Sequence, residues 1–124
     1  MRVLVAFEES YRSYRETIAA AIKVLRPQLE VGSVVLSGLE EELERFDPHA
    51  IVCSRPNRAN ATGWTAWIEM PVDPLRPAEV FYADGRRREA YGFDVREMVQ
   101  VLDEVEGSLP PGRGTLADKP LTRW

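Results

Sequence analysis

Residues 2–7 read RVLVAF, an almost uninterrupted apolar run from Arg2 to Phe7 that is rich in valine. This pattern is typical of a strand in the middle of a parallel sheet, where helices cover both faces. Two further runs, 30–36 (EVGSVVL) and 50–54 (AIVCS), have the same character. Helical patterns separate the three runs, so we expect a β-α-β-α-β unit with parallel strands in the spatial order 2-1-3.

Two helices are expected between these strands, because apolar residues recur there at steps of three and four. The apolar positions are Tyr11, Tyr14, Ile18, Ile22 and Leu25 in the first helix, then Leu39, Leu43 and Phe46 in the second. Two S-x-x-E capping boxes, 13–16 and 37–40, predict that Ser13 and Ser37 start these helices, with Ser10 as a rival start for the first. The prolines at 27 and 48 are expected to end them.

The second half of the chain changes character, because its apolar residues alternate with polar ones. Such alternation predicts strands at 64–70, 79–83 and 87–92. Asp84-Gly85 is a strong hairpin signal, and the polar loop 55–63 is too short and irregular to carry a crossover helix. We therefore expect an antiparallel β-meander to extend the three parallel strands.

A last helix is expected after the meander, with a capping box of its own. Asp94 is the predicted N-cap, Glu97 completes the box and Gly107 is the predicted stop. The apolar stripe of this helix consists of Val95, Met98, Val99, Leu102 and Val105. We therefore predict a single α/β domain over residues 1–107, followed by an extended C-terminal arm over 108–124.

The composition excludes several classes of protein. With 16 basic and 20 acidic residues the net charge is −4, which argues against nucleic acid as a partner. Apolar runs stay far below the ~20 residues that span a bilayer, and the start of the chain has no signal-peptide layout. We therefore expect a cytoplasmic protein without a membrane partner. The single cysteine, Cys53, is expected to be a small core residue, because it has no second cysteine to pair with.

Two segments carry a likeness to a known family. The run Arg2–Phe7 is followed by Glu8-Glu9 and an amphipathic helix, and residues 48–56 read PHAIVCSRP. Within residues 1–56 this pattern resembles the receiver domain of response regulators. The resemblance implies a three-layer, flavodoxin-like or receiver-like half and a signalling or regulatory role. In that family an acidic pair after the first strand holds magnesium, and the third strand ends in an aspartate that accepts a phosphoryl group.

The match to the receiver pattern is incomplete. Glu8 and Glu9 stand at the acidic pair, but Ser54 stands where the acceptor aspartate belongs. A serine cannot form an acyl phosphate, and losing the carboxylate removes an oxygen ligand for magnesium. Residues 79–83 offer no counterpart of the family's lysine, and the third and fourth crossover helices are missing. We therefore expect a degenerate receiver, or pseudo-receiver, that is not phosphorylated on aspartate; magnesium is the only cofactor that the resemblance suggests.

The candidate ligand or metal site consists of Glu8, Glu9, Ser54 and Arg55, because open α/β sheets bind ligands at the carboxyl ends of their strands. Two other interpretations remain open. Arg55 is able to form a structural ion pair with the two glutamates, or the glutamates are solvated charges that the helix dipole favours. His49 lies at the other end of the third strand and is expected to be exposed and idle, so Ser54 has no visible base.

Two further groups are candidates for binding. Arg86, Arg87 and Arg88 are able to bind an anion or an acidic partner, although solvated charges that guard a strand edge are the simpler explanation. The aromatic residues of the predicted meander are Trp64, Trp67, Phe81, Tyr82 and Tyr91. They form either core or, on a face that helices leave open, a dimer surface. Trp124 at the chain end suggests that the arm docks, on its own body or on a neighbour.

Three functional hypotheses follow. The first is a non-catalytic, receiver-like signalling or regulatory module that acts through protein–protein association, as a homo-oligomer or with a partner protein. The second is a small-ligand or metal-binding domain that uses Glu8, Glu9 and Arg55 at the strand ends. The third is a small hydrolase or transferase, which is short of nucleophile–base pairs.

Overall fold

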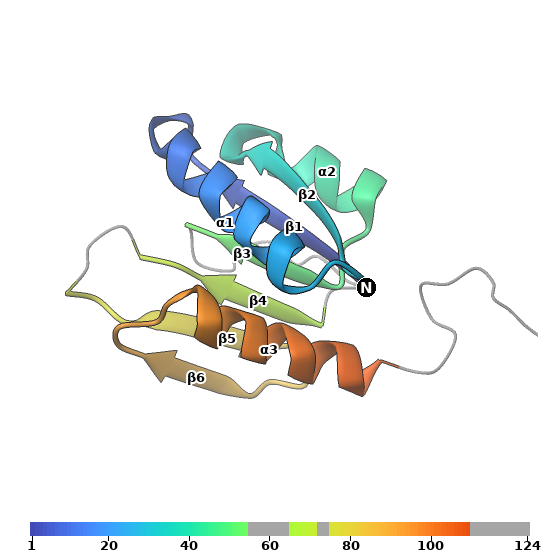
Figure 1. Ribbon diagram of the computed structural model, residues 1–124, viewed down its shortest axis with the longest axis vertical. Coiled ribbons are helices and arrows are strands. Elements are labelled where there is room, and N and C mark those ends of the chain that lie inside the picture. Colours follow the sequence, from blue (N-terminus) through green and yellow to red (C-terminus); the bar gives the residue numbers. More distant parts are fainter. Residues whose placement is uncertain (55–64, 72–74, 110–124) are drawn as a thin grey trace, which may run out of the picture.

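The computed structural model describes residues 1–54, 65–71 and 75–109 of the 124-residue chain (Figure 1). The described strands form one sheet in the order β2-β1-β3-β4-β5-β6. Their bounds are β1 Arg2–Phe7, β2 Glu30–Val35, β3 Ala50–Cys53, β4 Ala66–Glu69, β5 Ala78–Tyr82 and β6 Arg87–Ala90. The helices are α1 Arg12–Leu25, α2 Leu39–Phe46 and α3 Val95–Ser108, and short 3-10 turns η1 Glu9–Tyr11 and η2 Leu36–Gly38 precede the first two.

The sheet is mixed, as the sequence predicted. Strand β1 pairs in parallel with β2 and β3, while β4, β5 and β6 pair antiparallel with one another. The α/β class, the strand order 2-1-3, the meander and the C-terminal helix are thus confirmed. One junction was not foreseen, because β4 runs parallel to β3. The connection spans residues 54–65, about the dozen residues that a parallel crossover needs. The parallel part of the sheet therefore comprises the four strands β2, β1, β3 and β4.

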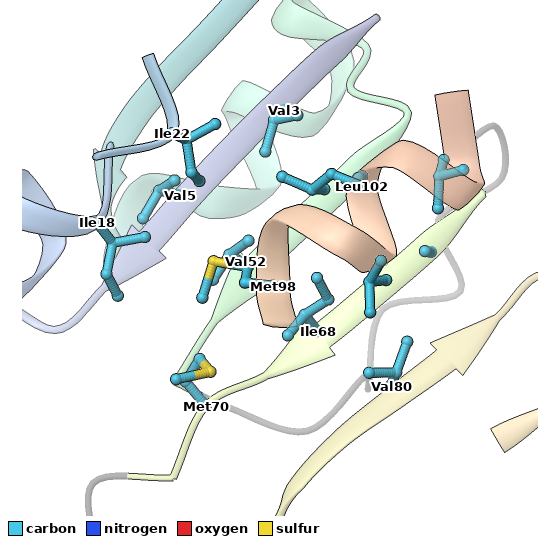
Figure 2. Close-up of a cluster of buried hydrophobic side chains, with 14 of the residues drawn as sticks. Val3, Val5, Ile18, Ile22, Val52, Ile68, Met70, Val80, Met98 and Leu102 are labelled. Atoms are coloured by element: carbon cyan, nitrogen blue, oxygen red, sulfur yellow. The ribbon is translucent and has the colours of Figure 1, made fainter. Parts of the chain in front are cut away.

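One face of the sheet carries the larger core, under α1 and α3 (Figure 1). Alternate residues of β1, β3, β4 and β5 point to this face, as the two-residue period of a strand requires. Figure 2 shows Ile18 and Ile22 of α1 and Met98 and Leu102 of α3 directed at this row of strand residues. The buried strand residues are Val3, Val5, Phe7, Ala50, Val52, Ala66, Ile68, Met70, Ala78 and Val80.

The opposite face carries a smaller core under η2 and α2. Its buried members are Leu4, Ala6, Leu36, Leu39, Ile51, Cys53 and Trp67. Helix α2 contacts β2 and β1, so its apolar stripe covers that side of the sheet. Partly buried Leu43 and Phe46 of α2 complete this cluster. The two cores give the first half of the chain the three layers that its sequence predicted.

The helix starts differ from the predicted capping boxes in two cases out of three. Helix α1 follows η1 and has Tyr11 at its N-cap, and α2 follows η2 and has Gly38 there, with no side-chain cap in either case. Ser13 is the second residue of α1, while Ser10 and Ser37 lie inside η1 and η2, so none of these serines lies at a helix cap. For α3 the prediction is confirmed, because the Asp94 carboxylate accepts a hydrogen bond from the Glu97 N–H at 3.0 Å.

Turn residues end the elements where local geometry requires it. Asp47 follows α2 with a φ of 51°, and Pro48 then prevents the helix from continuing. The β5–β6 hairpin contains the predicted Asp84-Gly85, and Gly85 has a φ of 96°, which favours glycine. Helix α3 extends through Gly107 to Ser108, slightly beyond its predicted stop.

An ion pair joins α1 to α3 outside the core. The Arg26 guanidinium donates to both carboxylate oxygens of Asp103, at 2.7 and 2.6 Å. This hydrogen bonding lowers the pKa of Asp103 from its ordinary value. Within the described part of the chain, none of the helices has the length and apolar content needed to cross a bilayer.

Candidate functional site

The carboxyl ends of β1, β3 and β4 lie side by side along one edge of the sheet. The Ser54 N–H donates to the Ala6 carbonyl at 3.3 Å, and the Met70 N–H donates to the Cys53 carbonyl at 2.8 Å. Continuing the strand registers makes Phe7, Ser54 and Met70 neighbours in one row. Strand alternation directs their side chains toward the face that α1 and α3 cover. Glu8 follows Phe7 directly, so the predicted residues Glu8 and Ser54 share this edge.

Glu8 and Glu9 begin the turn between β1 and α1. Glu8 is the exposed N-cap of η1, and the Glu9 side chain is also exposed. The described cation nearest to Glu9 is Arg15, whose Nη1 is 4.0 Å from the Glu9 Oε1. Arg55, the cation that the sequence suggested, lies outside the described residues. Among residues 1–54, 65–71 and 75–109, no three His, Cys, Asp or Glu side chains gather where they could hold a metal ion.

Two buried polar groups near this edge have no hydrogen-bond partner, namely the Ser54 hydroxyl and the Nε and Nη1 of Arg15. Arg15 lies one turn before the buried residues of α1, and its side chain is only 11% exposed. A serine becomes a nucleophile when a base accepts its proton, and the Ser54 hydroxyl contacts no such base. The described residues therefore provide no nucleophile–base pair at this position.

A cavity of about 260 Å³ opens at the same edge. We call it the carboxyl-edge hollow, and its lining residues are Tyr14, Met70, Pro71, Arg76, Ala78, Gly92 and Phe93. The Tyr14 ring is held edge-on to Phe7, with ring centroids 5.3 Å apart, which fixes one wall. Met70 lies at the end of the buried row that Figure 2 shows. Among the described lining residues, Arg76 is the charged one, and Tyr14, Met70 and Phe93 are the large apolar ones.

Arg76 brings a positive charge to the hollow. Its side chain is exposed, and within the described ranges it forms no ion pair or hydrogen bond. The acidic group that it influences is Glu69, which lies opposite Glu79 on the neighbouring strand. Burial and the adjacent Glu79 raise the pKa of Glu69, and Arg76 only partly opposes this shift. The Arg76 charge is therefore available to a ligand or partner.

Three large, exposed apolar side chains line the hollow or directly precede a residue that lines it. Leu75 is 83% exposed, Tyr91 71% and Tyr14 44%. Leu75 precedes the lining residue Arg76, and Tyr91 precedes the lining residue Gly92. We call these three residues together with the hollow the carboxyl-edge surface. Exposed apolar groups gathered in one place are typical of a binding surface.

The three consecutive arginines do not form a common anion site. Arg86 pairs with Asp84 and lies over the Tyr82 ring. Arg87 pairs with Glu79 and lies over the Phe81 ring. Arg88 is 4.0 Å from Glu104 of α3, on the face opposite to that of Arg87. Each guanidinium thus has an acidic partner within the fold, and strand alternation separates them.

The residues predicted for an interface lie in different environments. Trp67 is 1% exposed and belongs to the core beneath the α2 face. Tyr82 is half-buried against Arg86, whereas Tyr91 is exposed at the carboxyl-edge surface. Trp64 and Trp124 lie outside the described residues. Of the aromatic residues predicted for a dimer surface, Tyr91 is thus the one with a freely accessible ring in the described ranges.

The prediction for His49 was wrong, while that for Cys53 is confirmed. His49 is 2% exposed, and its Nδ1 accepts a hydrogen bond from the Arg2 N–H at 3.0 Å. Cys53 is fully buried. His49 was misjudged because its partner is a backbone group 47 residues away, which no local pattern reveals.

A second hollow, of about 390 Å³, lies near the β5–β6 turn and the end of α3. The charged groups and the Ser108 hydroxyl that line it have partners within the fold. Arg86 is paired with Asp84, and the Ser108 hydroxyl donates to the Val105 carbonyl at 2.8 Å. Glu104 faces Arg88. This arrangement stabilises the end of the hairpin and leaves no reactive group poised for chemistry.

Comparison with family models, with curated proteins and with solved structures found no match. We therefore argue the function from the geometry of this chain.

Proposed function

We propose that the protein is a non-catalytic, receiver-like regulatory module that acts through protein–protein association, in the simplest case with a second copy of itself. The observation that carries this proposal is the exposure of Leu75, Tyr91 and Tyr14 around one hollow at the carboxyl edge. Burying apolar surface stabilises association by about 25 cal/mol per Å². A small surface of this kind supports a weak, reversible complex rather than an obligate one.

The chemistry of the carboxyl edge favours a role without phosphorylation on aspartate. Ser54 occupies the end of β3, and its hydroxyl is buried without a base beside it. Glu8 and Glu9 are exposed to solvent next to this position. A treatment with acetyl phosphate followed by intact-mass measurement is expected to show no stable phosphoryl adduct. A stoichiometric adduct would contradict the proposed non-catalytic role.

Association is tested by sedimentation velocity over a wide range of protein concentration. The wild-type chain is expected to shift toward a dimer as its concentration rises. The double variant Leu75→Ser/Tyr91→Ser is expected to stay monomeric, because it loses the apolar rim. Val24→Ser is the matched control, since Val24 is 77% exposed on α1 but does not line the hollow.

Two results would contradict self-association through this surface. One is a wild-type chain that stays strictly monomeric at millimolar concentration. The other is a dimer that the double variant weakens no more than Val24→Ser does.

A second candidate function is the binding of a small ligand or metal ion by Glu8, Glu9 and Arg55. The Ser54 hydroxyl and the Nε and Nη1 of Arg15 favour it, because they are buried near this edge without a hydrogen bond and such donors are normally satisfied by a partner. Thermal unfolding with Mg²⁺, Mn²⁺ and nucleotides tests this candidate. Stabilisation that saturates supports it, and the absence of any shift at millimolar ligand removes it.

A further inference from the structure

We propose that the carboxyl-edge hollow binds a small organic anion, with the carboxylate or phosphate group on Arg76 and an apolar, planar body against Tyr14 and Phe93. This inference goes beyond the proposed association. Ligand binding requires only a single copy of the chain, so it is tested independently of the association.

The charge of the hollow selects an anion. Arg76 is the charged residue among the described residues that line it. Its guanidinium is unpaired within the described ranges, and a planar guanidinium is suited to bidentate hydrogen bonding with a carboxylate or phosphate. Glu69 does not line the hollow, because strand alternation directs its side chain to the sheet face opposite that of Met70.

The walls of the hollow select an apolar body. Tyr14 is fixed against Phe7, and Phe93, in the segment leading to α3, also lines the hollow. Met70 is flexible and adapts its shape to a ligand. Gly92 adopts a φ of 63°, and a side chain added there would meet nothing within 4 Å, so this side of the hollow is open for entry.

The size of the hollow limits the ligand. Its volume of about 260 Å³ lies just below the range of roughly 300–1,000 Å³ that is usual for small-molecule sites. A single aromatic ring with one anionic group fits this size better than a nucleotide does.

The position of the hollow agrees with a ligand site. It lies at the carboxyl end of β4, between the first turns of α1 and α3, and open α/β sheets bind ligands at this edge. At the start of α3 the Asp94 carboxylate accepts the Glu97 N–H and places a negative charge there, which disfavours a second anion. The anion is therefore assigned to Arg76.

The test uses benzoate and phenyl phosphate as probes, with benzyl alcohol as the uncharged analogue and inorganic phosphate as the anion without a ring. Each is titrated into the full chain, labelled with ¹⁵N, at a fixed low protein concentration. Both aromatic anions are expected to give saturable shifts in Tyr14, Met70 and Phe93. Benzyl alcohol and inorganic phosphate are each expected to bind about tenfold more weakly or worse, because each lacks one of the two contacts.

Variants separate the site from general charge effects. Arg76→Gln is expected to weaken benzoate binding at least about tenfold, since it removes the charge-assisted hydrogen bonds. Arg96→Gln is the matched control, because Arg96 is also exposed but does not line the hollow, and it should leave the affinity unchanged. Both replaced side chains are exposed, so thermal unfolding should confirm an intact fold.

Three results would overturn the inference. These are no saturable shift with either aromatic anion at millimolar concentration, equal affinity for benzyl alcohol, or equal losses in Arg76→Gln and Arg96→Gln. None of them affects the sedimentation test, so the two proposals fail independently.

Discussion

The two faces of the sheet use the same strands but are covered in different ways. On one face, α1 and α3 enclose a continuous apolar core that crosses β1, β3, β4 and β5. On the other, α2 contacts β1 and β2, and toward the meander the face becomes charged, with Glu69, Glu79 and Arg87 on adjacent strands. The difference suggests that the first face provides most of the stability, while the second tolerates polar groups.

The largest effect on the free energy of unfolding is expected from replacing a leucine by alanine, and its size should differ between the two faces. Leu102→Ala removes a fully buried side chain of α3 and should lower the free energy of unfolding by about 2–5 kcal/mol. Leu43→Ala acts on a partly buried residue of α2 and should cost no more than about half as much. Urea unfolding of both variants measures the difference. Equal losses of unfolding free energy in the two variants would mean that both faces contribute equally to stability.

A smaller effect is expected from the ion pair that joins α1 and α3. Asp103→Asn removes the hydrogen bonds from Arg26 and should lower stability less than either core substitution. The pKa of Asp103 is lowered in the folded state. The wild-type protein should therefore be more stable than Asp103→Asn above the ordinary aspartate pKa, and this difference in stability should disappear as the pH falls. Thermal unfolding at several pH values checks this, and a difference that persists in strong acid would argue against the ion pair as its cause.

The smallest effect is expected on the charged side of the meander. Glu69 has a raised pKa because of burial and Glu79, so its ionisation destabilises the fold as the pH rises. Glu69→Gln should therefore stabilise the protein at neutral pH by about 0.2–1 kcal/mol, toward the lower value because solvent screens the pair.

The gain from Glu69→Gln should fade as the pH falls and vanish well below the ordinary glutamate pKa of about 4.3, where Glu69 is protonated in both the folded and the unfolded state. Glu89→Gln, on exposed β6, serves as the control. A loss of stability at neutral pH in Glu69→Gln would show that the carboxylate itself is needed.

Much of the fold was predictable because it follows from local patterns. Uninterrupted apolar runs identified β1 and β3, alternation identified the meander, and Asp94 with Glu97 identified the start of α3. The serine boxes misled because α1 already begins at Arg12, one residue before Ser13, and because Ser37 lies inside the 3-10 turn that precedes α2. The parallel pairing of β4 was missed because the loop before it looked too short and irregular for a crossover.

The candidate site was only partly predictable. The strand pattern indicated that Glu8 and Ser54 would share the carboxyl edge. It gave no sign of Arg76 or the hollow, because these depend on segments before β5 and before α3 that have no periodicity. It also gave no sign that Arg86, Arg87 and Arg88 find separate acidic partners, since those partners lie on other strands or on α3, or within the turn itself.

We propose that the protein associates through the carboxyl-edge surface. The most direct test is a dilution series of ¹⁵N correlation spectra, from millimolar protein downward. Our account predicts that concentration-dependent shifts cluster at Tyr14, Leu75 and Tyr91 and are absent at Val24. Spectra that do not change with concentration, or shifts that cluster on α2 or β6 instead, would contradict it.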